Sequence, residues 1–240
     1  EDEVSHFTWA ITDDELNQRI AESFKKVEAL YIADGHHRSA SAAKVALKRR
    51  EEYPDAGPEV EFNYFLAVIF PDEDLFIMDY NRVVKDLNNL SKEELLQALK
   101  DKFSVQKQSA ALPFRPQAKG HFGMYLDGSW YELIAEPELY QDKDLIDSLD
   151  VSVLQQNLLA PVLGIEDPRT DERIDFVGGI RGLKELQERV DAGEAVAFAL
   201  YPTTMDELLD IADAEMIMPP KSTWFEPKLR SGLFVHKLSE

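Results

Sequence analysis

The apolar stretches of this 240-residue chain are short, and they alternate with signals for helix starts and tight turns. The segment from Phe62 to Phe70 is the strongest strand prediction, and its nine residues are far fewer than the ~20 that a membrane span needs. Short strands that interleave with helices favour an α+β architecture over a regular doubly wound sheet. Because the sequence has neither an internal repeat nor a long linker, we expect a single α+β domain over residues 1–240.

Helix-start signals place the predicted helices. Thr12–Glu15 and Ser91–Glu94 have the capping-box form, and they predict helices that end near Lys26 and Phe103. Further helices are predicted over 39–52, 150–159, about 180–190 and 204–212.

Predicted strands are apolar or alternating segments that end at Gly, Pro or Asp. Asp127-Gly128 lies at the centre of residues 121–134 and predicts a hairpin. A second hairpin is expected to join the strand over 62–70 to one over 75–80. The other predicted strands are 29–33, 174–177, 194–201 and 232–238. These elements predict a mixed sheet with hairpins and interleaved helices.

Charge and cysteine content narrow the class of function. The chain has 26 basic and 46 acidic residues, a net charge of −20 and an isoelectric point near 4.6. Such a surface repels nucleic-acid phosphates, so no nucleic-acid partner is expected, and an anionic ligand needs a local group of basic residues. Zero cysteines exclude disulfides, thiolate nucleophiles and cysteine-ligated metals. With no targeting segment and no membrane span, we expect a cytoplasmic protein without a membrane partner.

One segment, Asp34–Arg38, combines a turn with groups that bind anions. Gly35 permits a sharp turn, and the start of the following helix offers unpaired N–H groups and a partial positive charge. His36, His37 and Arg38 add donors on the first turn, which suits a phosphate. Asp34 would coordinate a magnesium ion or accept a proton from an attacking hydroxyl. The alternative is a capped helix with solvent-facing basic residues, and adjacent histidines do not favour a zinc pair.

A second segment, Met218–Lys228, gathers basic residues in a proline-rich loop. Lys221, Ser222, Thr223 and Lys228 are expected to bind phosphate or a substrate carboxylate. An acidic protein must collect its scarce cations to hold an anion, so we predict that this loop and the Asp34 turn line one pocket. The alternative is a crossover loop anchored by its aromatic residues.

Weaker candidates are His6, Asn81 and Arg82, which are expected to contact the substrate. His6 lies near Trp9, and Asn81-Arg82 is a donor pair near the end of a predicted strand. Gly178-Gly179 allows close approach of a phosphate, although a plain turn explains it equally simply.

Three motifs resemble a bacterial family catalogued as a domain of unknown function, number ten-fifteen. They are Ala33–Arg38, Met218–Thr223 and Phe225–Lys228, and the resemblance also includes His6, Trp9, Asn81-Arg82 and Leu163-Gly164. Members of that family have an additional N-terminal part. Since this chain begins at Glu1, without a methionine, we expect it to be the C-terminal portion of a longer protein.

The Asp34–Arg38 turn is also similar to a turn of the ParB/sulfiredoxin-like superfamily, a likeness centred on residues 28–52. In that superfamily the turn binds nucleotide phosphates at a helix start. Sulfiredoxin chemistry needs a cysteine that this chain lacks, and DNA-binding partition proteins fit poorly with its net charge. The resemblance therefore favours the branch of ADP-dependent free-serine kinases.

These observations together predict a phosphotransferase that binds a nucleotide or phosphate and acts on a small hydroxylated metabolite. Serine or phosphoserine is the substrate that the resemblance favours. Asp34, His36 and His37 are the predicted catalytic residues, and Mg²⁺ with ADP or ATP are the predicted cofactors. The alternatives are a non-catalytic nucleotide-binding regulatory module and a metal-dependent phosphatase that uses a histidine of the turn. Reaction direction and oligomeric state stay open.

Overall fold

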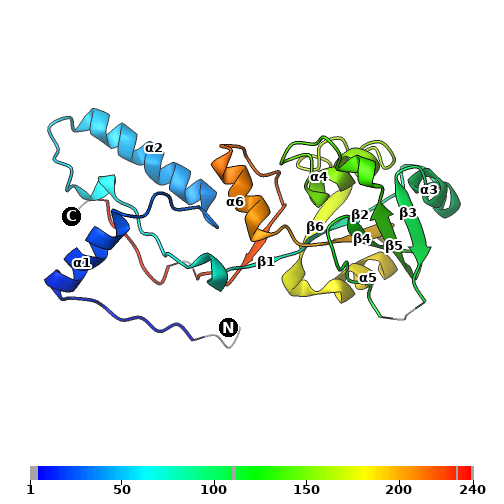
Figure 1. Ribbon diagram of the computed structural model, residues 1–240, viewed down its shortest axis with the longest axis horizontal. Coiled ribbons are helices and arrows are strands. Elements are labelled where there is room, and N and C mark those ends of the chain that lie inside the picture. Colours follow the sequence, from blue (N-terminus) through cyan, green and yellow to red (C-terminus); the bar gives the residue numbers. More distant parts are fainter. Residues whose placement is uncertain (1–4, 110–111, 231, 239–240) are drawn as a thin grey trace.

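A computed structural model describes residues 5–109, 112–230 and 232–238 of the chain. The molecule is elongated (Figure 1), with a helix-covered sheet at one end. Helices α1 (Asp14–Phe24) and α2 (His36–Glu52) lie at the other end, together with the C-terminal residues. Helix α6 (Met205–Asp213) and the short strand β1 (Phe76–Met78) lie between the two ends.

The predicted capping box at Ser91–Glu94 forms, whereas the one predicted at Thr12–Glu15 does not, because Asp13 and not Thr12 is the N-cap of α1. Capping boxes begin α3 (Lys92–Leu99), where Ser91 pairs with Glu94, and α6, where Thr204 pairs with Glu207. Helix α1 is capped by Asp13, whose carboxylate accepts from the Leu16 N–H at 2.9 Å. The remaining helical segments are α4 (Asp150–Leu154), the π-helical turn Gln155–Leu159, α5 (Leu183–Asp191) and short 3-10 turns at 61–63, 72–74, 137–139 and 179–181. None of the helices in the described ranges is long and apolar enough to cross a membrane.

Six strands form the main sheet in the order β3-β5-β4-β7-β2-β6, and each neighbouring pair is antiparallel rather than mixed in direction. Their bounds are β2 Tyr80–Val84, β3 Phe103–Lys107, β4 His121–Leu126, β5 Ser129–Ala135, β6 Ile174–Gly178 and β7 Val196–Leu200. The predicted hairpin at Asp127-Gly128 joins β4 to β5. A two-stranded sheet pairs β1 with β8 (Trp224–Glu226). The α+β class is thus confirmed.

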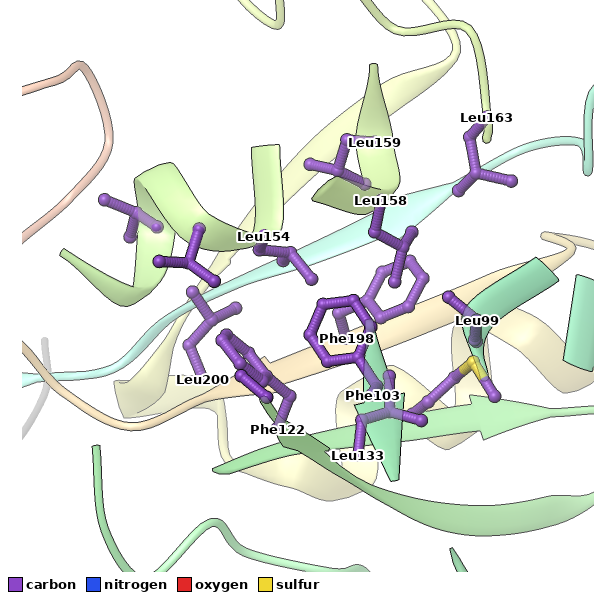
Figure 2. Packing of buried hydrophobic residues seen from close by; sticks show 14 of the residues in the cluster. Leu99, Phe103, Phe122, Leu133, Leu154, Leu158, Leu159, Leu163, Phe198 and Leu200 are labelled. Atoms are coloured by element: carbon purple, nitrogen blue, oxygen red, sulfur yellow. The ribbon is translucent and has the colours of Figure 1, made fainter. Parts of the chain in front are cut away.

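The hydrophobic core lies on both faces of the main sheet. On one face, Leu99 of α3 and Leu154 and Leu158 of the α4 region pack over Phe122 and Phe198 (Figure 2). On the other face, α5 contributes its buried residues Leu183, Leu186 and Val190 to a second cluster. This three-layer packing fixes the position of β2 and of the segments that leave its two ends.

Two predicted strands, 29–33 and 62–70, do not form. Neither has strand pairing in the described part of the chain, and most of their apolar side chains are exposed, with Leu30 at 61% and Leu66 at 54%. Residues 61–63 form a 3-10 turn instead. A strand needs a hydrogen-bonded partner as well as apolar, β-favouring residues, so local composition was not sufficient here. The predicted terminal strand over 232–238 is also wrong over its described residues, which lack strand pairing.

The expected hairpin between 62–70 and 75–80 is replaced by a long-range pairing. Strand β1 pairs with β8 in the register Ile77 opposite Phe225, and β2 begins two residues after β1 ends. Strand β3 is not among the predicted strands, because its exposed positions are polar, which is typical of an edge strand with one neighbour.

Gly178 and Gly179, at the end of β6, lie where neighbouring side chains leave no room for a Cβ. They are therefore needed for packing as well as for a turn. A Cβ on Gly178 would lie 2.4 Å from Cε3 of Trp224, and one on Gly179 would lie 2.6 Å from Oδ1 of Asp79. The absence of side chains lets the indole of β8 rest directly on the sheet backbone.

We expect Gly178→Ala to destabilise the fold by about 1–3 kcal/mol, because the added methyl cannot fit beneath the Trp224 ring without moving β8. Urea denaturation measures the change. Gly57→Ala is the matched control, since its Cβ would meet only the flexible carboxylate end of Glu59. Equal stability of the two variants would contradict this account of β8 packing.

Asp150, the first residue of α4, is a buried carboxylate with three hydrogen-bond contacts. It accepts from the Gly120 N–H through both oxygens at 3.1 Å and from the Tyr140 hydroxyl at 2.6 Å. Burial nevertheless raises the pKa of Asp150 to about 6, because desolvation outweighs these donors. Ionised Asp150 therefore lowers stability near neutral pH, although it positions the start of α4.

Asp150→Asn should change how stability depends on pH. A carboxyl whose folded pKa lies above its unfolded value favours the fold at low pH, and this contribution disappears as pH rises through about 6. Between pH 4 and pH 7 the wild type should lose on the order of 2 kcal/mol relative to the variant, whose amide stays neutral. Denaturation at several pH values measures this, with exposed Asp142→Asn as control. A difference independent of pH would contradict it.

Candidate functional site

The turn that precedes α2 is open to an incoming anion. Helix α2 begins at His36, as predicted, and its N-cap Gly35 has φ 86° and supplies no side-chain cap. The side chains of His36, His37 and Arg38 are exposed on this first turn. In Figure 1 this end of α2 is the one nearest α6, and Tyr31 hydrogen-bonds Asp213 of α6. The N–H groups of the first turn are thus free of side-chain caps.

Gly35 is favoured here because its positive φ is strained for residues with a side chain. The position where its Cβ would stand lies 3.1 Å from Nη2 of the flexible Arg38 side chain. The guanidinium of Arg38 therefore folds back over the glycine. Nη2 also lies 3.5 Å from Oδ2 of Asp34, which offsets the unfavourable position of a cation at a helix N-terminus.

The Met218–Lys228 loop reaches this turn, as predicted. Nζ of Lys228 lies 3.3 Å from Oδ1 of Asp34 and 5.5 Å from the centre of the Trp224 ring. Asp34 is consequently placed between two cations, one from each segment, although 194 positions separate the two partners. The two motifs therefore meet at this contact, and a pocket lined by both stays a prediction.

The other predicted residues of the loop point in different directions. Nζ of Lys221 lies 5.5 Å from the centre of the Tyr80 ring, and Lys221 has φ 58°. Ser222 is buried, its hydroxyl donates to the Pro219 carbonyl, and its own carbonyl accepts from Thr203 at 3.3 Å. Thr223 is partly buried. Lys221 and Lys228 are therefore the exposed cations of this loop segment, whereas the Ser222 hydroxyl is engaged within it.

Asn81 and Arg82 lie in β2 and are buried. Asn81 donates to the carboxylate of Asp79, and its side-chain oxygen accepts from the Leu200 N–H at 3.0 Å. Both ends of this amide are therefore used between neighbouring strands. Asp79 also pairs with exposed Arg115 at 3.3 Å. Sequence reasoning did not include Asp79, although its place beside an Asn-Arg pair in an apolar strand was a usable signal.

Arg82 fastens the Met218–Lys228 loop to the sheet. Its guanidinium donates to the Tyr80 carbonyl and, at 3.0 Å, to the Lys221 carbonyl, and it lies 5.3 Å from the centre of the Phe176 ring. Burial lowers the pKa of Arg82 to about 10, so the group remains protonated at neutral pH. No ion pair joins Arg82 to any carboxylate in residues 5–109, 112–230 and 232–238.

His6 lies in the exposed segment that precedes α1. Its neighbours Phe7 and Trp9 stack with ring centres 6.4 Å apart. Within the described residues, no hydrogen bond or ion pair links His6 to the Asp34 turn. Its role in substrate binding stays a prediction.

The turn supplies a limited set of metal ligands. The described residues contain no group of three or more His, Asp or Glu arranged to hold a metal ion. Asp34 contributes one carboxylate, and Mg²⁺ in nucleotide sites is held by one or two carboxylates together with phosphates and water. This donor set fits a Mg²⁺ that arrives with a nucleotide.

The chain belongs to the family described as "Protein of unknown function (DUF1015)", whose sequence profile matches residues 1–152. The matched region includes the Asp34–Arg38 turn and ends before the Met218–Lys228 loop. The sequence matches no curated protein.

The fold is similar to several solved structures. A free serine kinase in complex with AMP is 15% identical, with a TM-score of 0.43 over 90% of this chain and 81% of that one. A mutant of free serine kinase in complex with ADP is 17% identical, with the same TM-score and coverage. A conserved hypothetical protein from Pyrococcus furiosus is 15% identical, with a TM-score of 0.44 over 88% and 82% of the two chains. Because the sequence identity is only 15–17%, no residue's role is transferred from these proteins to the present chain.

Proposed function

We propose that this protein is a nucleotide-dependent phosphotransferase that acts on a small hydroxylated metabolite, with serine or phosphoserine as the favoured substrate. The observation that carries the proposal is the meeting of Arg38 and Lys228 at Asp34, beside the uncapped start of α2. Two cations and a row of backbone donors at one point are suited to a phosphate, and they stand out in a chain of net charge −20.

In the absence of ligand, Asp34 neutralises the cations that a phosphate would use. An incoming phosphate would draw Arg38 and Lys228 to its own oxygens, since exposed ion pairs at 3.3–3.5 Å are weak and easily exchanged. The Asp34 carboxylate would then be released for its part in the reaction. His36 and His37 would donate to the same phosphate from the first turn of α2.

The proposed transfer forms a bond from the substrate hydroxyl oxygen to phosphorus and breaks the bond from that phosphorus to the nucleotide's leaving oxygen. Asp34 takes the hydroxyl proton or ligates the Mg²⁺ that accompanies the nucleotide, and that ion would neutralise phosphate charge. Lys221 and Lys228 hold phosphate or the substrate carboxylate from the loop. Catalysis would rest on positioning and charge neutralisation, as phosphoryl transfer generally does.

Arg38→Ala should raise the dissociation constant for ADP or ATP about tenfold or more, because a hydrogen bond to a charged group is worth ~1.5–3 kcal/mol. Isothermal titration calorimetry measures the change. Arg49→Ala, which removes the same side chain at the opposite end of α2, is the control and should bind as the wild type does. Thermal melts of both variants should match the wild type, since the Arg38 side chain is 70% exposed. An unchanged dissociation constant for ADP or ATP in Arg38→Ala would contradict a phosphate site at this turn.

Asp34→Asn should separate binding from transfer. Loss of the carboxylate frees Arg38 and Lys228, so affinity for the nucleotide without Mg²⁺ should stay the same or rise, whereas transfer to the hydroxyl should fall at least a hundredfold. The assay incubates the protein with Mg²⁺, nucleotide and serine, or phosphoserine with AMP or ADP, and follows both products.

Each alternative function gives a different result in that assay. Nucleotide binding without turnover in the wild type would identify a regulatory module, and release of phosphate from phosphoserine without nucleotide would identify a phosphatase. An Asp34→Asn variant that transfers at the wild-type rate would exclude Asp34 as base or metal ligand.

A further inference from the structure

A second candidate site lies at the Pro219-Pro220 end of the Met218–Lys228 loop. A pocket of about 230 Å³ opens between the start of α4, the 167–169 loop and the residues Pro219 and Pro220. It is smaller than the ~300–1,000 Å³ pockets that bind drug-sized ligands, so its occupant must be a small metabolite. Nothing in the Asp34 turn contributes to its walls.

Arg82 brings an uncompensated positive charge to this pocket. The residue is 4% exposed, and its guanidinium has five N–H donors, of which two bond the carbonyls of Tyr80 and Lys221. In the described part of the chain no carboxylate pairs with it. A buried guanidinium without a counter-ion is costly, and a bound carboxylate would satisfy both its charge and its planar donors.

Asp147 brings an uncompensated negative charge to the same pocket. Its Oδ1 accepts from the neutral Gln156 amide at 2.7 Å, and among the described residues no cation pairs with it. The other two charged groups of the lining, Asp167 and Arg169, neutralise each other at 2.8 Å. The pocket therefore presents one free charge of each sign to a ligand.

Ser152 supplies a hydroxyl to the wall of the same pocket. The residue is 7% exposed and lines the pocket, and its hydroxyl makes no hydrogen bond within the described residues. A hydroxyl that faces a pocket without a protein partner is expected to bond a ligand or water.

From these three groups we infer that the pocket binds a small zwitterionic α-amino acid. Arg82 and the Ser152 hydroxyl hold its carboxylate, and Asp147 holds its ammonium. This inference goes beyond the proposed function, because binding here requires neither a nucleotide nor phosphoryl transfer. Serine is one member of the ligand class.

Calorimetric titration of the full chain without nucleotide tests the inference. L-Alanine and L-serine should bind at least tenfold more tightly than L-lactate, which lacks the ammonium, and than ethanolamine, which lacks the carboxylate. Amino-acid binding no tighter than that of these two half-ligands, or no saturable binding, would overturn the inference.

Two variants test the assignment of residues. Asp147→Asn and Ser152→Ala should each weaken amino-acid binding, the former tenfold or more, while Asp142→Asn should not. Asp147 is preferred to Arg82 for substitution because Arg82 also holds the loop. Wild-type affinity in Asp147→Asn, with an unchanged melting temperature, would overturn the ammonium site.

A cross-comparison keeps this inference distinct from the proposed function. Arg38→Ala should retain amino-acid binding, and Asp147→Asn should retain nucleotide binding. A protein that binds amino acids but transfers no phosphate supports the pocket and rejects the proposed function. A protein that binds nucleotide but shows no preference for amino acids over L-lactate and ethanolamine rejects the amino-acid pocket and leaves the proposed function in place.

Discussion

The guanidinium of Arg82, buried in β2, fixes one end of the segment on which both candidate sites depend. By holding the Lys221 carbonyl at 3.0 Å, it keeps the Met218–Lys228 loop against the sheet. Beyond this anchor, Trp224 rests on the bare backbone of Gly178, and Lys228 ends at Asp34. Loss of the anchor would release the Trp224 contact and the ion pair together, since all three lie in one short stretch of chain. A single buried cation thus helps to position the groups at both ends of the loop.

Local sequence signals predicted local structure well. The start of α2 at His36, the capping boxes of α3 and α6, and the β4–β5 hairpin all depend on residues within a few positions of each other. Strands that need a distant neighbour were harder to predict. Residues 62–70 are as apolar as a central strand but have no described partner, whereas the three residues of β1 form a strand because β8 lies beside them.

The candidate sites also differ in whether local sequence signals or long-range packing determine them. The Asp34 turn could be read from one short motif, and the approach of Lys228 followed from a charge argument about an acidic protein. The pocket at Arg82, Asp147 and Ser152 left no comparable pattern, because Arg82 lies far in sequence from the other two and those two look like ordinary helix-start residues. The burial of Arg82 and Ser152 gives them their significance, and burial is set by the packing of α4 on the sheet.

The contact between Asp34 and Lys228 also bears on how the protein is made. The ribosome synthesises the Asp34 turn long before its partner Lys228, which follows 194 positions later in the chain. A nascent chain can therefore pack β2 to β7 while the turn still lacks its second cation. A product cut short before Trp224 would keep most of the sheet but not the assembled anion site. The complete site therefore forms only in chains that have been synthesised at least as far as Lys228.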